Sequence, residues 1–170
     1  RVNNSMDLGA VTINRGITVN INGTGVMDPL GRGVVTVLGG TLSSDATSDA
    51  QFGNQDFRLY GGSTLLLDNS NVTVANFDRR LQSSVDIDLT SSTLRLIGDG
   101  ATVGATSDQT VNSIDYQGGG VISLENDSAA SATRLTTLSA NSLNRIGQGT
   151  LQIRNLNGTA TASVLGTASG

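Results

Sequence analysis

Two aspartates in the segment VDIDL, Asp86 and Asp88, have the clearest potential for chemistry in this chain. Residues two apart in a strand lie on the same face, so both carboxylates would project outward while Val85, Ile87 and Leu89 turn inward. Two carboxylates on one face can ligate calcium or act as the acid and base of a polysaccharide-cleaving site. Asp86 and Asp88 are therefore the candidate metal ligands, and calcium is the one cofactor that they suggest.

A wider acidic stripe is expected around this pair. Asp56 and Asp115 occupy corresponding places in their own segments of the chain, so neighbouring strands would add their carboxylates to the same face. The interpretation that we favour is a solvated polar face whose charges are offset by Arg58 and Arg145. This interpretation assigns no catalytic residue.

The residue types that are missing exclude several classes of enzyme. The 170 residues include no Cys, His or Trp, and all ten basic residues are Arg. The chain therefore cannot form disulfides, thiolate metal sites or a serine–histidine triad. Because the chain has no Lys, no Trp and a single glutamate, Glu125, we expect that the protein is not an enzyme.

The charge distribution limits the partners. The formal net charge is -4 and no basic cluster is present, which argues against a nucleic-acid partner. The one adjacent basic pair, Arg79 and Arg80, is expected in a solvated loop. No segment approaches the roughly 20 apolar residues of a membrane helix, so no membrane span is predicted.

Apolar pairs recur along the chain at a nearly constant spacing, which is the signature of an internal repeat. One residue separates the two members of each pair, which is the period of a strand. Short inserts such as YGGST, QGGGV and GQGT precede the pairs and predict tight corners. The predicted core column contains Val35, Val37, Leu65, Leu67, Leu94, Leu96, Ile122, Leu124, Leu151 and Ile153.

A second column contains only Gly and Asn and lies two residues beyond each apolar pair. Both residue types tolerate a positive φ angle, so a left-handed turn residue is expected to end each strand. The members of this predicted turn column are Gly39, Asn69, Gly98, Asn126 and Asn155.

A period of about 29 residues predicts an all-β fold, a parallel β-solenoid of about six coils. The solenoid would cover residues 1–158, and residues 159–170 would form a linker or inter-subunit segment. Each coil can bury its aliphatic side chains only by stacking on a neighbour about 4.8 Å away. The alternative is an antiparallel β-sandwich, because DFRLYGGSTLLLD also has the pattern of a β-hairpin.

The segments GGSTLLLDNSNVTV, SSTLRLIGDG and NSLNRIGQGTLQIRNLNG resemble autotransporter-associated β-strand repeats. The longer segment from IDYQGGG to LQIRNL is similar to repeats of giant surface proteins from planctomycete-like bacteria. The resemblance covers residues 57–158. It implies a right-handed parallel β-helix in a secreted or cell-surface protein, and it brings no catalytic residues with it.

The resulting hypothesis is a structural segment of an extracellular bacterial fibre, adhesin or surface layer that assembles by head-to-tail β-stacking. Its partners would be other copies or further repeats of itself, with surface glycans as a second class. The alternative is a polysaccharide-binding or polysaccharide-cleaving β-helix of the tailspike or lyase type. Tyr60 and Tyr116 could stack on sugars in that case, although packing in or at the rim of the core is the role that we expect.

Overall fold

A computed structural model of the chain describes residues 10–21, 33–44, 51–70, 80–98, 106–126 and 135–156. These residues form two six-stranded sheets and contain no helix, hence none that could cross a membrane. The odd sheet consists of β1 (Val11–Ile13), β3 (Val34–Leu38), β5 (Asp56–Tyr60), β7 (Asp86–Thr90), β9 (Thr106–Gln117) and β11 (Leu135–Arg145). The even sheet consists of β2 (Thr18–Ile21), β4 (Thr41–Ser44), β6 (Thr64–Asp68), β8 (Thr93–Gly98), β10 (Gly119–Asn126) and β12 (Thr150–Leu156). The predicted linker at 159–170 lies outside the described residues.

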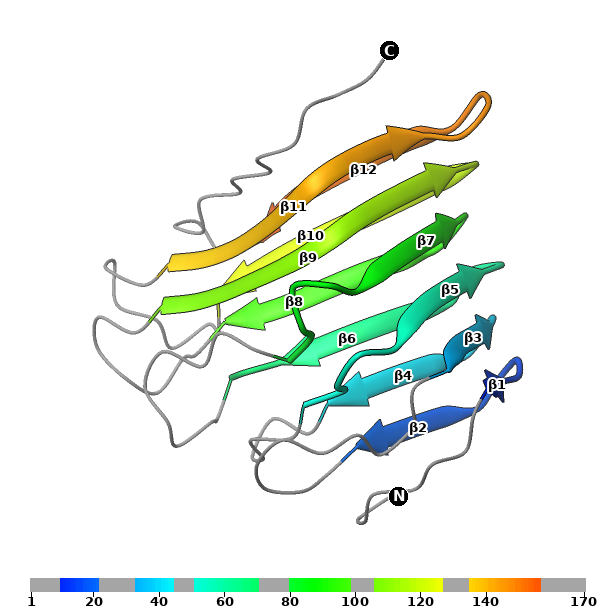
Figure 1. Cartoon of the computed structure of the whole chain (residues 1–170), viewed down its shortest axis with the longest axis horizontal. Helices are drawn as coiled ribbons and strands as arrows, with labels where there is room; N and C mark the ends of the chain where they lie inside the picture. Colours follow the sequence, from blue (N-terminus) through cyan, green and yellow to red (C-terminus); the bar gives the residue numbers. More distant parts are fainter. Residues whose placement is uncertain are drawn as a thin grey trace.

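The chain winds as a parallel β-solenoid of six coils. Within each sheet, neighbouring strands come from successive coils, and every pairing between described strands is parallel. In Figure 1 the odd strands run from left to right in front, and the chain returns behind them in the even sheet before it steps upward. This path is right-handed, as parallel crossovers almost always are. The predicted solenoid is confirmed, and the antiparallel sandwich is wrong.

The core lies between the two sheets, where apolar side chains of successive coils form columns. Burial of each aliphatic side chain contributes about 1.5–3 kcal/mol to the stability of the fold. Because the pairing is in register, one coil's buried residue rests directly on the next. One fully buried column in each sheet contains Val35, Phe57, Ile87 and Ile114 in the odd sheet, and Leu42, Leu65, Leu94 and Ile122 in the even sheet.

The first coils are shorter than the predicted period, which changes the start of the predicted core column. Leu42 pairs with Leu65 and Leu65 pairs with Leu94, so the earlier of these two coils contains fewer residues than the later one. A step of one predicted period back from Leu65 therefore passes its true partner, Leu42, and reaches Val35. Val35 lies in the odd sheet beside Phe57. Val37 lies in the odd sheet as well. Both valines are buried, but they belong to the opposite wall of the core.

The end of the predicted column is also shifted, by two residues. Ile153, not Leu151, is the register partner of Ile122, and Leu151 stands opposite Gly120. A Cβ on Gly120 would lie 3.3 Å from the Leu151 Cδ1, so the leucine occupies space that the glycine leaves empty. The remaining members share the even sheet in the expected register: Leu65, Leu94 and Ile122 in one column, and Leu67, Leu96 and Leu124 in the next.

Left-handed residues do recur, but at a different place from the predicted turn column. In the described residues, all positive φ angles except that of Gly53 fall at the corners that lead from an odd strand to the following even strand. Gly39, with φ of 70°, is the one member of the predicted column with such an angle, and it belongs to these corners. The other members lie in or directly after even strands, with no positive φ recorded at them: Asn69 after β6, Gly98 at the end of β8, Asn126 at the end of β10, and Asn155 in β12.

Two successive corners fit against each other. Ser91, between β7 and β8, has φ of 49° and is the one non-glycine residue with a positive φ in the described part of the chain. Gly118, at the next corner, has φ of 67°, and a Cβ on it would overlap the Ser91 hydroxyl. The backbone conformation therefore favours glycine at position 118, and a side chain there would also force the Ser91 hydroxyl to move.

Two adjacent leucines of β6 provide a test of this core, because Leu65 faces inward and Leu66 faces outward. Leu65→Ala should lower the free energy of unfolding by about 2–5 kcal/mol, because a fully buried side chain leaves a cavity. Leu66→Ala, on the same strand but facing outward, should cost less than about 1 kcal/mol. Urea titration followed by circular dichroism measures both values. Equal losses would contradict the facing of β6.

Candidate functional site

The candidate aspartates lie on the outer face of the odd sheet. Along β7, Ile87 and Leu89 are buried, whereas Asp86 and Asp88 face outward and are half-buried. Val85, just before the strand, is buried as well. The arrangement inferred from the VDIDL alternation is therefore the one that the structure shows.

The four acidic residues form two adjacent columns on this face. Asp86 follows Asp56 from one coil to the next, and the Asp86 backbone N–H donates a hydrogen bond of 3.0 Å to the Asp56 Oδ1. Asp115 is the register partner of Asp88, one column further along the strands. The expected stripe is thus two columns wide.

The column that contains Asp86 is engaged in hydrogen bonds between coils. The Asp86 Oδ1 accepts the Asn112 Nδ2 at 2.8 Å and the Ser113 Oγ at 2.7 Å. Hydrogen bonds to a carboxylate are stronger than those between neutral groups. Asp86 therefore ties β7 to β9, which is a structural role.

The second column has a different electrostatic environment. The Asp88 Oδ2 lies 3.5 Å from the Arg58 Nε, with the Asp88 side chain 42% exposed. Burial raises the pKa of Asp88, the charge of Asp115 raises it further, and Arg58 opposes both effects. The Asp115 Oδ1 accepts the Asn144 Nδ2 at 2.7 Å. Arg58 thus offsets only part of the repulsion between the carboxylates of Asp88 and Asp115.

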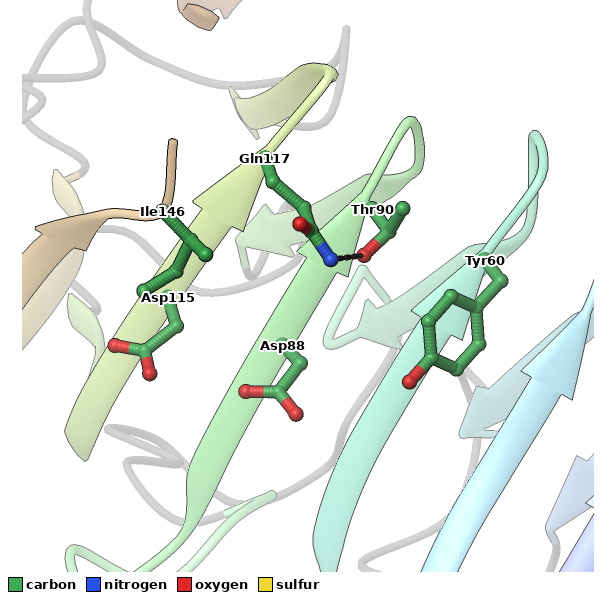
Figure 2. Close-up of a pocket in the computed structure, with 6 residues that line it drawn as sticks. All are labelled: Tyr60, Asp88, Thr90, Asp115, Gln117 and Ile146. Atoms are coloured by element: carbon green, nitrogen blue, oxygen red, sulfur yellow. Dashed lines mark hydrogen bonds between the residues drawn. The ribbon is translucent and has the colours of Figure 1, made fainter. Parts of the chain in front are cut away.

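A shallow groove of about 220 Å³ runs beside these two carboxylates on the outer face of the odd sheet (Figure 2). It crosses the ends of four successive odd strands. At its centre the Gln117 Nε2 donates a hydrogen bond of 2.9 Å to the Thr90 Oγ1. The residues that line it are Tyr60, Asp88, Thr90, Asp115, Gln117 and Ile146.

Three other predicted residues are distributed between this face and the core. Tyr60 lines the groove, whereas Tyr116 is partly buried and packs against the core. Arg145 is the register partner of Tyr116, so it does not stand in the column of Asp88 and Asp115. Arg58 is therefore the arginine that faces the candidate aspartates.

Within the described strands and corners, no group of three or more His, Cys, Asp or Glu side chains is placed to hold a metal ion. Asp86 and Asp88 stand two residues apart on one strand, and Asp56 and Asp115 lie beside them on the neighbouring strands. The carboxylates of this face are instead engaged by a backbone N–H, by amides and a hydroxyl, and by Arg58. Calcium binding by this pair stays a prediction, and the geometry adds no ligand to it.

An ion pair on the even sheet is absent from the sequence-based expectations. The Arg95 Nε and Nη2 donate to the two Glu125 carboxylate oxygens at 2.7 and 2.6 Å, and the Ser123 Oγ donates to Oε1 at 2.9 Å. These hydrogen bonds lower the pKa of Glu125, with Arg95 as the main cause and burial opposing it. The bidentate pair joins β8 to β10. The alternation of β8 places Arg95 outward, but the chain alone gives no register that pairs it with the single glutamate.

Arg80 differs most from its expected setting. A solvated loop is the setting predicted for it and for Arg79, which lies outside the described residues, yet the Arg80 side chain is completely buried. The Arg80 Nε donates to the Asn69 Oδ1 at 2.6 Å, and Nη2 donates to the Asp68 carbonyl at 2.7 Å. The asparagine of the predicted turn column is therefore held by a side-chain hydrogen bond. The one feature of the sequence that hints at this burial is the apolar residue Leu81, which directly follows Arg80.

Two carboxyl substitutions should have opposite pH dependence. Because the folded-state pKa of Asp88 is raised, its unfavourable contribution appears as pH rises through that pKa. Asp88→Asn should therefore be more stable relative to the unmodified chain at pH 7 than at pH 3. The pKa of Glu125 is lowered, so its stabilisation is present at neutral pH and is lost as pH falls through the folded-state pKa.

Glu125→Gln is accordingly the matched control with the reverse sign. It should be less stable than the unmodified chain at pH 7 by about 1–3 kcal/mol, and the difference should shrink at pH 3. Urea titrations of the three proteins at both pH values measure these differences. A shift of both variants in the same direction would contradict the electrostatic assignment.

Comparison with protein-family models, with curated proteins and with solved structures finds no match to this chain. The resemblance to autotransporter-associated repeats therefore stays a prediction. What the protein does has to be inferred from the arrangement of its own residues, above all the ends of the solenoid and the groove on the odd sheet.

Proposed function

We propose that this chain is a structural segment of an extracellular fibre, adhesin or surface layer, and that its coils continue by head-to-tail stacking onto further coils. The observation that carries the proposal is the state of the two end coils. Side chains that stand in the fully buried columns elsewhere remain exposed there, although they face in the same direction.

At the C-terminal end the exposed apolar residues belong to β12. Ile153 is the register partner of Ile122, which is fully buried, yet Ile153 is 45% exposed. Leu151 is only partly buried. Among the described strands, β12 pairs only with β10 and β11 only with β9, so each leaves one row of backbone hydrogen-bonding groups available.

The N-terminal end has the same character. Val19 on β2 continues the column of Leu42 but is only partly buried, whereas Leu42 is fully buried. Ile17, just before the strand, is 51% exposed. Within the described sheets, β1 and β2 also pair on one side only.

The two ends are complementary because each continues the same ladders in opposite directions. Stacking of one copy on the next would bury the exposed aliphatic residues and would pair the edge strands. The contact joins two different surfaces, so it does not close on itself and generates an open filament. The outer face of the odd sheet, which carries Arg58, Asp88 and Asp115, would stay in solvent along the filament.

The extracellular setting rests on the resemblance to surface-protein repeats. The outer face of the odd sheet, which carries Arg58, Asp88 and Asp115, is polar, as a face in contact with solvent along a fibre would be. A polysaccharide-cleaving role stays a prediction, and a fall in polysaccharide viscosity that Asp86→Asn abolishes would replace the structural proposal.

Substitutions at the two ends test the stacking. Ile153→Arg and Ile17→Arg should each abolish concentration-dependent filaments, because a charge would be buried between copies. Leu38→Arg is the matched control, since Leu38 is 40% exposed on a lateral strand face. Negative-stain electron microscopy and sedimentation velocity report assembly. A chain that stays monomeric at high concentration, or equal loss with Leu38→Arg, would contradict the proposal.

The absence of cysteine allows a sharper control for the same prediction. Position 18 starts the ladder that position 152 ends, so Thr18→Cys with Gln152→Cys should join copies into covalent oligomers under oxidising conditions. Neighbouring strands bring such positions within the Cα distance that a disulfide requires. Either single variant, or Thr18→Cys with Arg154→Cys two residues out of register, should not form the oligomers.

A further inference from the structure

The groove on the odd sheet has two apolar walls and a polar floor. Tyr60, Thr90 and Gln117 follow one another on successive strands, and Ile146, directly after β11, continues the row beside Gln117. Tyr60 and Ile146 are the two ends of that row. Figure 2 shows the Tyr60 ring on one side of the depression and the Ile146 side chain on the other. Neighbouring strands are about 4.8 Å apart, so three steps separate the walls by about 14 Å at the backbone. This opening admits one sugar-sized ring.

The polar groups of the groove are mainly hydrogen-bond acceptors. Asp88 contributes a carboxylate, and Asp115 has one oxygen that accepts from Asn144 and a second carboxylate oxygen as a further acceptor. The Gln117 side-chain Nε2 donates to the Thr90 Oγ1, which leaves the Gln117 side-chain Oε1 as a further acceptor. Because acceptors outnumber the hydroxyl and amide donors of Tyr60, Thr90 and Gln117, the groove favours a ligand that brings donors, such as hydroxyl or amino groups.

The charge of the groove excludes acidic ligands. Two carboxylates, Asp88 and Asp115, face the depression, and Arg58 stands beside only the first of them. A uronate, sulfate or phosphate would meet like charge there, which is unfavourable. An amine would instead gain an ion pair.

We propose that this groove binds a single residue of a glycan that carries free hydroxyl or amino groups and no acidic groups, with Tyr60 as the stacking surface. Aromatic rings offer a large apolar face with a polar tip, which suits the apolar face of a sugar ring. Asp115 and Gln117 accept hydrogen bonds from the ring substituents. The groove lies on a lateral face, so every copy in a stack would present one, and its binding does not depend on filament formation.

Affinity for three tetrasaccharides of the same β-1,4 backbone tests the proposal. The probes are a fully deacetylated chitosan tetramer, a cellulose tetramer and a uronate tetramer, with the full chain and isothermal titration calorimetry. The chitosan and cellulose probes should bind, with the chitosan probe tighter, and the uronate probe should show no binding. Absence of binding by both non-acidic probes, or equal binding of the uronate, would overturn the proposal.

Substitutions locate the binding within the groove. Tyr60→Ala, Gln117→Ala and Asp115→Asn should each weaken affinity for the chitosan probe about tenfold or more. Their matched controls, Asp86→Asn on the same sheet and Leu66→Ala on the outer face of the even sheet, should retain the affinity of the unmodified chain. Thermal unfolding monitored by circular dichroism verifies that each variant is folded. Equal losses in the controls would overturn the assignment.

A calcium titration completes the test. Calcium alone should not bind the groove, because the aspartates that line it are only two. Calcium binding that Asp115→Asn abolishes, together with no glycan binding, would identify the groove as a cation site and overturn the proposal. Loss of glycan binding with filaments intact would reject this inference alone, whereas loss of filaments with glycan binding intact would reject only the structural proposal.

Discussion

In-register stacking of parallel strands is the constraint on which this structure depends. A strand of one coil finds hydrogen-bond partners only in the coils above and below it, and its inward side chain finds apolar neighbours there as well. Both interactions require residues of similar type at the same position of successive coils, which follow one another at the spacing of neighbouring strands. The buried columns, the tight corners and the polar outer rows all follow from this demand.

Much of the fold could be predicted because stacking leaves a strong imprint on the sequence. The alternation around Leu65 and Leu94 indicated the inward face, and the Gly-rich inserts indicated the corners. The length of each coil could not be predicted, because loops tolerate insertion without a change in the ladder. The shift at Leu151 depends on space left by Gly120, which is a contact between coils that no single segment records.

Polar residues were predicted less well than apolar ones for the same reason. Asp86 and Asp88 could be assigned to the outer face from their own strand, but their partners lie on other coils. Arg80 shows the limit most clearly, since its hydrogen-bond partners, including Asn69, make burial of a cation possible. Four coils together form the groove near Tyr60, so it appears in no repeat considered alone.

The fit of Ser91 against Gly118 has a consequence for how such a chain can vary. At this contact a side chain gained at position 118 would need the space that the Ser91 hydroxyl occupies, whereas a Cβ on the corner glycines Gly61 and Gly147 would meet no atom within 4 Å. Changes at positions 91 and 118 should therefore be correlated. A larger residue at position 118 would be expected only together with a smaller residue at position 91, while the corners with open space can vary independently.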